Sequence, residues 1–354
     1  MRFLLGITSI FLLSLSVHAQ WVRQKIDTTA SFRGLAVVNE KIVWASGTGG
    51  TVIRTIDGGK TWNVITVPGA EKLDFRDIEA FDANTAYILS IGNGDSSRIY
   101  KTTDGGKTWW PEFKNSDPKA FYDAIACWDS ERCLAMSDPV DGSFLVNLRS
   151  PGLNGHSVRP PDWLAVRRIR ATSGEASFAA SGTCLIAVGK YDPQAFSTGH
   201  EHPAQGLAYV VTGGSDARIL RSSDGGSTWE AIKTELIRGT AGSGIFSIAM
   251  FDSKNGVIVG GNYEKPEEHE RNLAFTTDGG ATWTLKQGLT GYRSGVALVD
   301  GHTIIAVGTN GSDITRDAGK TWTVLGKENL NAVASKGPRA TWAVGPKGMV
   351  VKLK

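Results

Sequence analysis

Three arginines in this 354-residue chain each follow an aromatic residue at the start of an apolar run: Arg33, Arg76 and Arg293. A guanidinium presents a planar fork of N–H donors that suits a carboxylate or a similar anion. Arginines at the starts of strands can also form ion pairs that hold neighbouring elements together. The sequence therefore predicts either an anion-binding site or a set of structural ion pairs.

Acidic and phenolic side chains occur at comparable positions beside apolar runs. They are Tyr122, Asp123, Asp138, Asp141, Tyr263 and Tyr292. Together with the arginines they could form a recognition surface for an anionic group. In the structural alternative, Asp77, Asp123 and Asp138 are the ion-pair partners of the arginines. For a glycosidase that uses two carboxylates, the distance between those carboxylates would decide the mechanism.

A repeated turn indicates which elements position these residues. The pattern [Ser/Thr]-x-Asp-x-Gly-x-x-Trp occurs with its aspartate at Asp57, Asp104, Asp224, Asp278 and Asp317. An aspartate in a turn can accept hydrogen bonds from nearby backbone N–H groups, and the glycine allows a positive φ. We predict that these carboxylates form turns and have no catalytic role.

Each turn closes a unit of four short apolar runs, which in the first unit cover residues 33–38, 41–46, 51–54 and 62–66. Repeated units of this kind predict the blades of an all-β propeller. The interval between Asp104 and Asp224 is too long for one blade. We expect a blade there whose inner strand is at 121–127 and which has residues 150–155 in place of the turn. The next blade should begin at 176–180 and carry the longest insertion, 190–203.

The carboxyl-terminal unit brings the count to seven blades. It has three strands, and its third is Met349–Leu353, while the run Trp21–Gln24 resembles a strand that follows the turn. We predict that Trp21–Gln24 pairs beside Met349–Leu353 and closes the ring. In a propeller, the connections into each inner strand share one face with those between the second and third strands. This face would gather the candidate site residues and the insertion at the mouth of the channel.

Residues 1–20 have the features of a cleaved signal peptide. Arg2 precedes an apolar run at 3–17, and small residues permit cleavage after Ala19 or Gln20. The run is short for a membrane anchor. The sequence therefore predicts a signal peptide at 1–20 and a propeller at 21–354. We expect a periplasmic or extracellular location, with no membrane span after the signal is removed.

Composition limits the remaining function classes. The 38 basic residues nearly balance the 35 acidic ones, so a nucleic-acid partner is not expected. Cys127 and Cys133 flank a short turn, and export would permit a disulfide between them, while Cys184 has the character of a buried residue. His200 and His202 could ligate a metal, but a solvated loop is the simpler interpretation, so neither a metal nor another cofactor is predicted.

The repeated turn resembles the Asp box, or BNR repeat, first noticed in bacterial neuraminidases and found in enzymes and non-enzymes alike. The whole mature chain also resembles propellers of the photosystem II stability/assembly factor type, in their general bacterial branch. The segments that carry this resemblance are residues 31–35, 44–50, 121–124, 137–142 and 178–182. The resemblance implies an exported, seven-bladed, non-catalytic scaffold that binds a protein partner or an anionic ligand through an Arg-rich channel mouth. We expect a monomer.

A glycoside hydrolase of the sialidase type is the alternative. It would need three arginines, a tyrosine nucleophile and an acidic aspartate, and the candidate residues at the mouth could supply each type. However, the Arg-Ile/Leu-Pro signature of sialidases is absent, because Arg33 is followed by Gly34 and Leu35. Seven blades also differ from the six of sialidases. The sequence therefore favours a binding scaffold over an enzyme.

Overall fold

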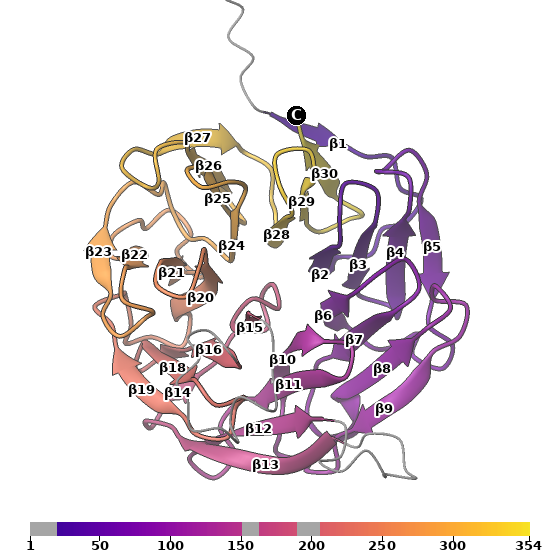
Figure 1. Ribbon diagram of the computed structural model, residues 1–354, viewed down its shortest axis with the longest axis horizontal. Coiled ribbons are helices and arrows are strands. Elements are labelled where there is room, and N and C mark those ends of the chain that lie inside the picture. Colours follow the sequence, from indigo (N-terminus) through magenta and orange to yellow (C-terminus); the bar gives the residue numbers. More distant parts are fainter. Residues whose placement is uncertain (1–19, 151–162, 190–205) are drawn as a thin grey trace, which may run out of the picture.

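The computed structural model describes residues 20–150, 163–189 and 206–354. Their strands form seven antiparallel sheets, arranged as blades around a central opening (Figure 1). Strands dominate because short runs of apolar, β-branched and aromatic residues alternate with Gly-rich turns. The prediction of an all-β, seven-bladed propeller is confirmed.

The first three blades follow one another along the chain, each running from an inner to an outer strand. They comprise β2 (Phe32–Val37), β3 (Val43–Gly47), β4 (Thr51–Thr55) and β5 (Asn63–Thr66); β6 (Phe75–Ala80), β7 (Ala86–Ser90), β8 (Arg98–Thr102) and β9 (Trp110–Lys114), with the 3-10 turn η1 (Gly94–Ser96); and β10 (Tyr122–Asp129), β11 (Arg132–Ser137), β12 (Ser143–Arg149) and β13 (Trp163–Arg170).

The fourth to sixth blades repeat this order, and two short strands, β14 (Glu175–Ala176) and β17 (Gly213–Gly214), extend the fifth sheet at its inner edge. The blades comprise β15 (Leu185–Val188), β16 (Leu207–Val211), β18 (Arg218–Ser222) and β19 (Glu230–Lys233); β20 (Ser243–Met250), β21 (Gly256–Asn262), β22 (Leu273–Thr276) and β23 (Thr284–Lys286); and β24 (Gly295–Leu298), β25 (Ile304–Gly308), β26 (Gly311–Thr315) and β27 (Thr323–Gly326).

The seventh blade closes the ring with strands from both ends of the described chain. It comprises β28 (Ala332–Ser335), β29 (Thr341–Val344), β30 (Val350–Leu353) and β1 (Trp21–Arg23). Trp21 lies opposite Leu353 and Arg23 opposite Val351 in the antiparallel register. The predicted closure is confirmed, and it leaves only short sheet edges.

Two expectations for the fourth blade are wrong. Its inner strand is β15 rather than residues 176–180, which form only part of β14 and then leave the sheet. The insertion, of which residues 190–205 lie outside the described chain, joins the first strand β15 to the second strand β16. The Gly206 carbonyl at its end accepts a hydrogen bond from Gly225 N in an Asp box. The described residues on both sides of the insertion therefore lie at the Asp-box face, opposite the channel mouth.

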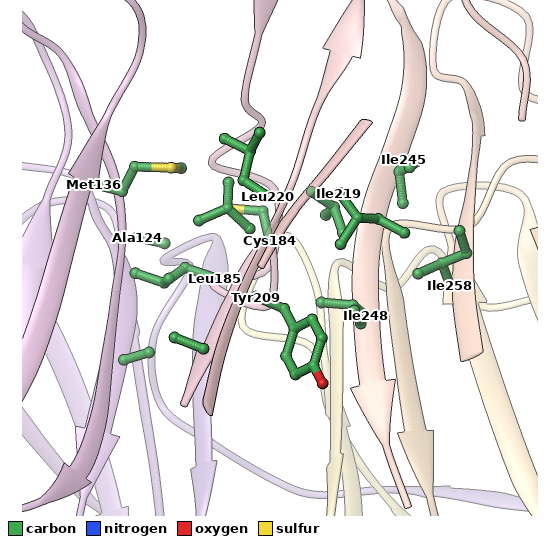
Figure 2. Close-up of a cluster of buried hydrophobic side chains, with 14 of the residues drawn as sticks. Ala124, Met136, Cys184, Leu185, Tyr209, Ile219, Leu220, Ile245, Ile248 and Ile258 are labelled. Carbon is green, nitrogen blue, oxygen red and sulfur yellow. The ribbon is translucent and has the colours of Figure 1, made fainter. Parts of the chain in front are cut away.

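Apolar clusters between neighbouring blades form the core. Along β3, Val43 and Ala45 pack toward the seventh blade while Trp44 packs toward the second. Figure 2 shows a larger cluster, in which Met136 of the third blade and Ile258 of the fifth lie on either side of Tyr209 in the fourth. Because both faces of each inner sheet region are buried, these strands have nearly continuous apolar sequences.

The five Asp boxes share one hydrogen-bond pattern. In the first, Thr61 donates to Asp57 Oδ1 through its N–H (2.9 Å) and to Asp57 Oδ2 through its hydroxyl (2.6 Å). Thr55 also donates its hydroxyl to Asp57 Oδ1 (2.8 Å). The boxes of Asp104, Asp224, Asp278 and Asp317 repeat these bonds. The prediction that each carboxylate accepts hydrogen bonds from its own turn is confirmed.

The local structure defines the state of the three cysteines. Cys127 on β10 lies directly opposite Cys133 on β11, and the two are joined by a disulfide, whereas Cys184 is free and buried. In the part of the chain that the structure describes, no helix has the length and apolar character needed to cross a bilayer.

Candidate functional site

A β-bulge at the start of the inner strand places several of the candidate side chains. The strand register shifts between Phe32 and Gly34, between Phe75 and Asp77, between Tyr122 and Ala124, and between Ile245 and Ser247. The residues skipped by these shifts are Arg33, Arg76, Asp123 and Phe246. A bulge leaves one residue unpaired and redirects its side chain. All of these bulge residues line one pocket.

This pocket is lined by residues at the starts of inner strands, including Arg33 on β2 and Arg76 on β6. Figure 1 shows the inner strands around the central opening. The volume of the pocket is about 390 Å³. The predicted site residues that line it are Arg33, Arg76, Asp123, Asp138, Tyr263 and Tyr292. The structure therefore brings these residues together, and we refer to this cavity as the mouth pocket.

Two guanidinium groups from neighbouring blades form the basic side of the mouth pocket. Arg33 Nη1 donates to the carbonyl of Ala180 (3.0 Å), and Arg76 Nη1 donates to the carbonyl of Ala179 (3.3 Å). Arg76 Nε is paired with Asp74 Oδ2 at 2.8 Å. Burial lowers the pKa of Arg33, and the nearby charge of Arg76 lowers it further. An anion between these groups would therefore relieve a repulsion.

Two carboxylates of the third blade form the acidic side. Asp123 is 1% exposed, and its Oδ2 has no hydrogen-bond partner among the described residues. Asp138, at the end of β11, accepts the Ser177 N–H on Oδ1 (2.8 Å). Burial raises the pKa of Asp138 to about 6 and raises that of Asp123 well above its usual range, with the charge of Asp138 adding to the rise at Asp123. The expected ion pairs of Arg33 or Arg76 with these aspartates do not form.

Aromatic rings form the third side of the mouth pocket. Phe178 and Phe246 stack with their centroids 3.9 Å apart, and Tyr292 meets Phe246 edge-on at 4.7 Å. Tyr263 packs edge-on against both phenylalanines and is 47% exposed. Burial raises the pKa of Tyr292, while the charge of Arg33 opposes that rise. The pocket can therefore offer charge-assisted hydrogen bonds beside an aromatic surface.

The other predicted site residues lie away from this pocket. The Tyr122 hydroxyl donates to Asn147 Oδ1 at 2.7 Å inside the third blade. Asp141 forms an exposed ion pair with Lys119 (2.9 Å). Arg293 is almost completely buried, and its guanidinium is paired with Asp313. The three predicted arginines therefore do not form one cluster.

The segment Ser177–Ser181 contributes pocket residues that sequence reasoning assigned to an inner strand. Its Phe178 ring and the carbonyls of Ala179 and Ala180 are part of the mouth pocket or its hydrogen bonds. Ser181 anchors the segment by donating to the Ser294 carbonyl (2.8 Å). The run at 176–180 resembled a strand, and only the turn-forming Ser181, Gly182 and Thr183 that follow it indicated that it would leave the sheet.

The described residues contain no group of three or more His, Cys, Asp or Glu side chains that could hold a metal ion. His200 and His202, considered above as possible ligands, lie outside the described residues. The polar groups of the mouth pocket are instead suited to charged organic groups.

The fold, the Asp boxes and the bulged inner strands together define a seven-bladed β-propeller of BNR repeats. The family model described as "Photosynthesis system II assembly factor YCF48" matches residues 13–120. A search of curated proteins finds no match. Over that segment the chain is similar to this family, in line with the sequence resemblance.

Solved structures share the fold over most of the chain. "YCF48 bound to D1 peptide" matches with a TM-score of 0.62 and 15% identity, covering 94% of each chain. YCF48 from Cyanidioschyzon merolae matches with a TM-score of 0.58 and 17% identity, covering 94% of this chain and 98% of the other. The GH74 enzyme of Niastella koreensis matches with a TM-score of 0.61 and 15% identity, covering 94% of this chain but 53% of the enzyme.

Proposed function

We propose that this protein is a non-catalytic scaffold that binds a protein partner at the mouth pocket, through an anionic group held by Arg33 and Arg76. The observation that carries the proposal is the convergence of these two guanidiniums in one pocket. Arg33 forms no ion pair with any described residue, and Arg76 pairs only with Asp74. The solved structure of a YCF48 propeller bound to a D1 peptide supports a peptide or protein as the partner.

The test is a pull-down from the exported fraction with Arg33→Gln/Arg76→Gln as bait. We expect the partner to be lost while the melting temperature stays close to that of the wild type. A matched control removes two exposed positive charges elsewhere, through Arg316→Gln/Arg339→Gln. Raising the salt concentration should weaken the wild-type interaction, since exposed charges at the pocket rim are screened. Equal capture by both variants would exclude the proposed site.

Glycoside hydrolysis is the second candidate function, because Asp123 and Asp138 lie in one pocket with raised pKa values. Two features argue against the sialidase form of this activity. The Tyr122 hydroxyl is engaged by Asn147, and Arg293 is withdrawn to Asp313. The candidate is tested with a panel of aryl-glycosides that includes a sialoside. Turnover that disappears in Asp138→Asn would favour the hydrolase over the scaffold.

We also propose that the protein acts outside the cytoplasm, in the periplasm or the extracellular space. The proposal rests on the signal-peptide features of residues 1–20. The Cys127–Cys133 disulfide supports it, because disulfides persist in oxidising compartments. Mass spectrometry of the protein from its native host should find an amino terminus at Gln20 or Trp21, and an intact Met1 would contradict export by cleavage.

A further inference from the structure

The mouth pocket carries two kinds of charge, and the proposed function uses only one of them. Arg33 and Arg76 account for an anion, but Asp123 and Asp138 line the same cavity and, when ionised, would repel that anion. A site that binds only an anion has no need of two carboxylates in its wall, one of them, Asp123, fully buried.

The arginines form no ion pair with these carboxylates among the described residues, although the nearby charge of Arg76 opposes the rise in the pKa of Asp123. Arg76 is oriented by Asp74 and by the Ala179 carbonyl, and Arg33 by the Ala180 carbonyl. Neither Asp123 nor Asp138 forms an ion pair with a lysine or arginine of the described chain. Among the described residues, the Asp138 carboxylate has one hydrogen-bond partner, the Ser177 N–H. Asp123 is buried with Oδ2 unpartnered among those residues, which is unusual because buried polar atoms are nearly always hydrogen-bonded.

The remaining walls suit a cation as well. Phe178, Phe246, Tyr263 and Tyr292 line the same pocket, and a cation over an aromatic face is stabilised by the ring quadrupole. The walls thus combine aromatic rings with carboxylates that have no ion-pair partner among the described residues. An ammonium group can donate hydrogen bonds to such carboxylates and lie against such aromatic rings.

We propose that Asp123 and Asp138 form a cation subsite that takes a primary ammonium group of the ligand, beside the anionic group held by Arg33 and Arg76. The ligand is then a group that carries both charges, such as a peptide end with a lysine side chain or an α-amino group. This inference rests on the proposed function for its anionic half, and its cationic half is independent of it.

The test uses three small probes that share a carboxylate and differ in their ammonium group. Nα-acetyl-L-lysine has a side-chain ammonium, Nε-acetyl-L-lysine has an α-ammonium, and Nα-acetyl-L-norleucine has none. Dissociation constants are measured by NMR titration of the mature protein. We expect one lysine isomer to bind about tenfold more tightly than the norleucine derivative, as one charge-assisted hydrogen bond would give. The tighter isomer identifies the source of the ammonium.

The variant Asp123→Asn/Asp138→Asn should reduce this tenfold preference to less than about twofold, and the exposed control Asp141→Asn should leave it unchanged. If the double variant does not fold, Asp138→Asn alone is used, because Asp138 is only half-buried. A preference that is absent in the wild type, or that survives in the Asp138 variant, overturns the cation subsite.

The two proposals fail in different ways. Arg33→Gln/Arg76→Gln should weaken all three probes together, because all three carry the carboxylate. If that variant leaves the norleucine derivative unaffected, the anionic half and with it the proposed function are overturned. If the lysine preference alone is absent, only the cation subsite is overturned.

Discussion

Arg293 and Asp313 form an ion pair that is completely enclosed in the sixth blade, with Arg293 Nη2 2.6 Å and Nε 2.8 Å from Asp313 Oδ2. Their side chains are 1% and 0% exposed. Thr290 adds two hydrogen bonds to the same carboxylate, from its N–H (3.0 Å) and its hydroxyl (2.9 Å). This pair separates Arg293 from Arg33 and Arg76, which share its position beside an aromatic residue but face the mouth pocket.

Replacement of Arg293 by alanine should lower the free energy of unfolding by about 3–5 kcal/mol, because Asp313 would remain buried without a counter-charge. The measurement is urea unfolding followed by fluorescence. The control is Arg339→Ala, whose partner Glu40 is also exposed, and it should change stability by less than about 1 kcal/mol. Similar losses in the two variants would contradict a structural role for Arg293.

The sequence was sufficient to predict the ring because each Asp box is a local turn. The bonds of Asp57 to Thr55 and Thr61 span only a few residues, so their pattern is visible in the chain itself. Ring closure was predicted because the last unit lacks a fourth strand after Met349–Leu353. Both predictions depend on short-range hydrogen bonding and on counting strands.

The site was predictable only in part, because side-chain direction depends on long-range contacts. Arg33, Arg76, Asp123 and Asp138 could be placed at one mouth from strand topology. The withdrawal of Arg293 could not be predicted, because its partner Asp313 is on another strand and nothing local marks the pair. The position of the Phe178 ring depends on its stacking against Phe246, which is distant in the sequence.

Replacement of an Asp-box aspartate, as in Asp104→Ala, should lower the melting temperature by a few degrees and leave probe binding at the mouth pocket unchanged. The turn would lose the acceptor for the Thr108 N–H and hydroxyl groups (3.0 and 2.7 Å). Differential scanning calorimetry and the NMR titration measure the two effects. Lost binding with unchanged stability would indicate that the box has a functional role.

The Asp boxes should also make the stability of the folded protein depend on pH in the acid range. Hydrogen bonds from Thr61, Thr108, Thr282 and Thr321 lower the pKa values of Asp57, Asp104, Asp278 and Asp317 to about 2. A carboxyl whose pKa is lowered on folding stabilises the protein above its unfolded pKa near 4, and this contribution is lost as the pH falls toward 2. Acid unfolding should therefore begin below about pH 4.

Asp77 and Glu79, on the inner strand β6, should make the folded protein less stable as the pH rises. Burial raises the pKa of Asp77 to about 7 and that of Glu79 to about 8, with Asp77 adding to the rise at Glu79. Because the folded protein then binds more protons than the unfolded chain, stability should fall as the pH rises from about 4 to 8. Urea unfolding of Glu79→Gln should show a weaker dependence in this range, whereas the exposed control Glu267→Gln should match the wild type.

The disulfide determines how many free thiols the unfolded protein should have, and this number can be measured without a ligand. Thiol titration of the unfolded, unreduced protein should find one free thiol, on Cys184, because Cys127 and Cys133 are bonded. Reduction before titration should raise the number to three. Three free thiols without reduction, in protein taken from an oxidising compartment, would show that the hairpin of β10 and β11 is not cross-linked there.

Close backbone packing beside the mouth pocket gives a way to perturb the site from outside its lining. Gly213 on β17 lies opposite Gly244 on β20, and a Cβ on Gly213 would overlap the Phe178 ring and the Ser243 carbonyl oxygen. Gly213→Ala should therefore displace Phe178 from Phe246, lower the free energy of unfolding by about 1–3 kcal/mol and weaken probe binding. Gly301→Ala is the matched control, because a Cβ there meets no atom within 4 Å. Unchanged probe affinity in a destabilised Gly213→Ala protein would show that the position of Phe178 does not determine binding.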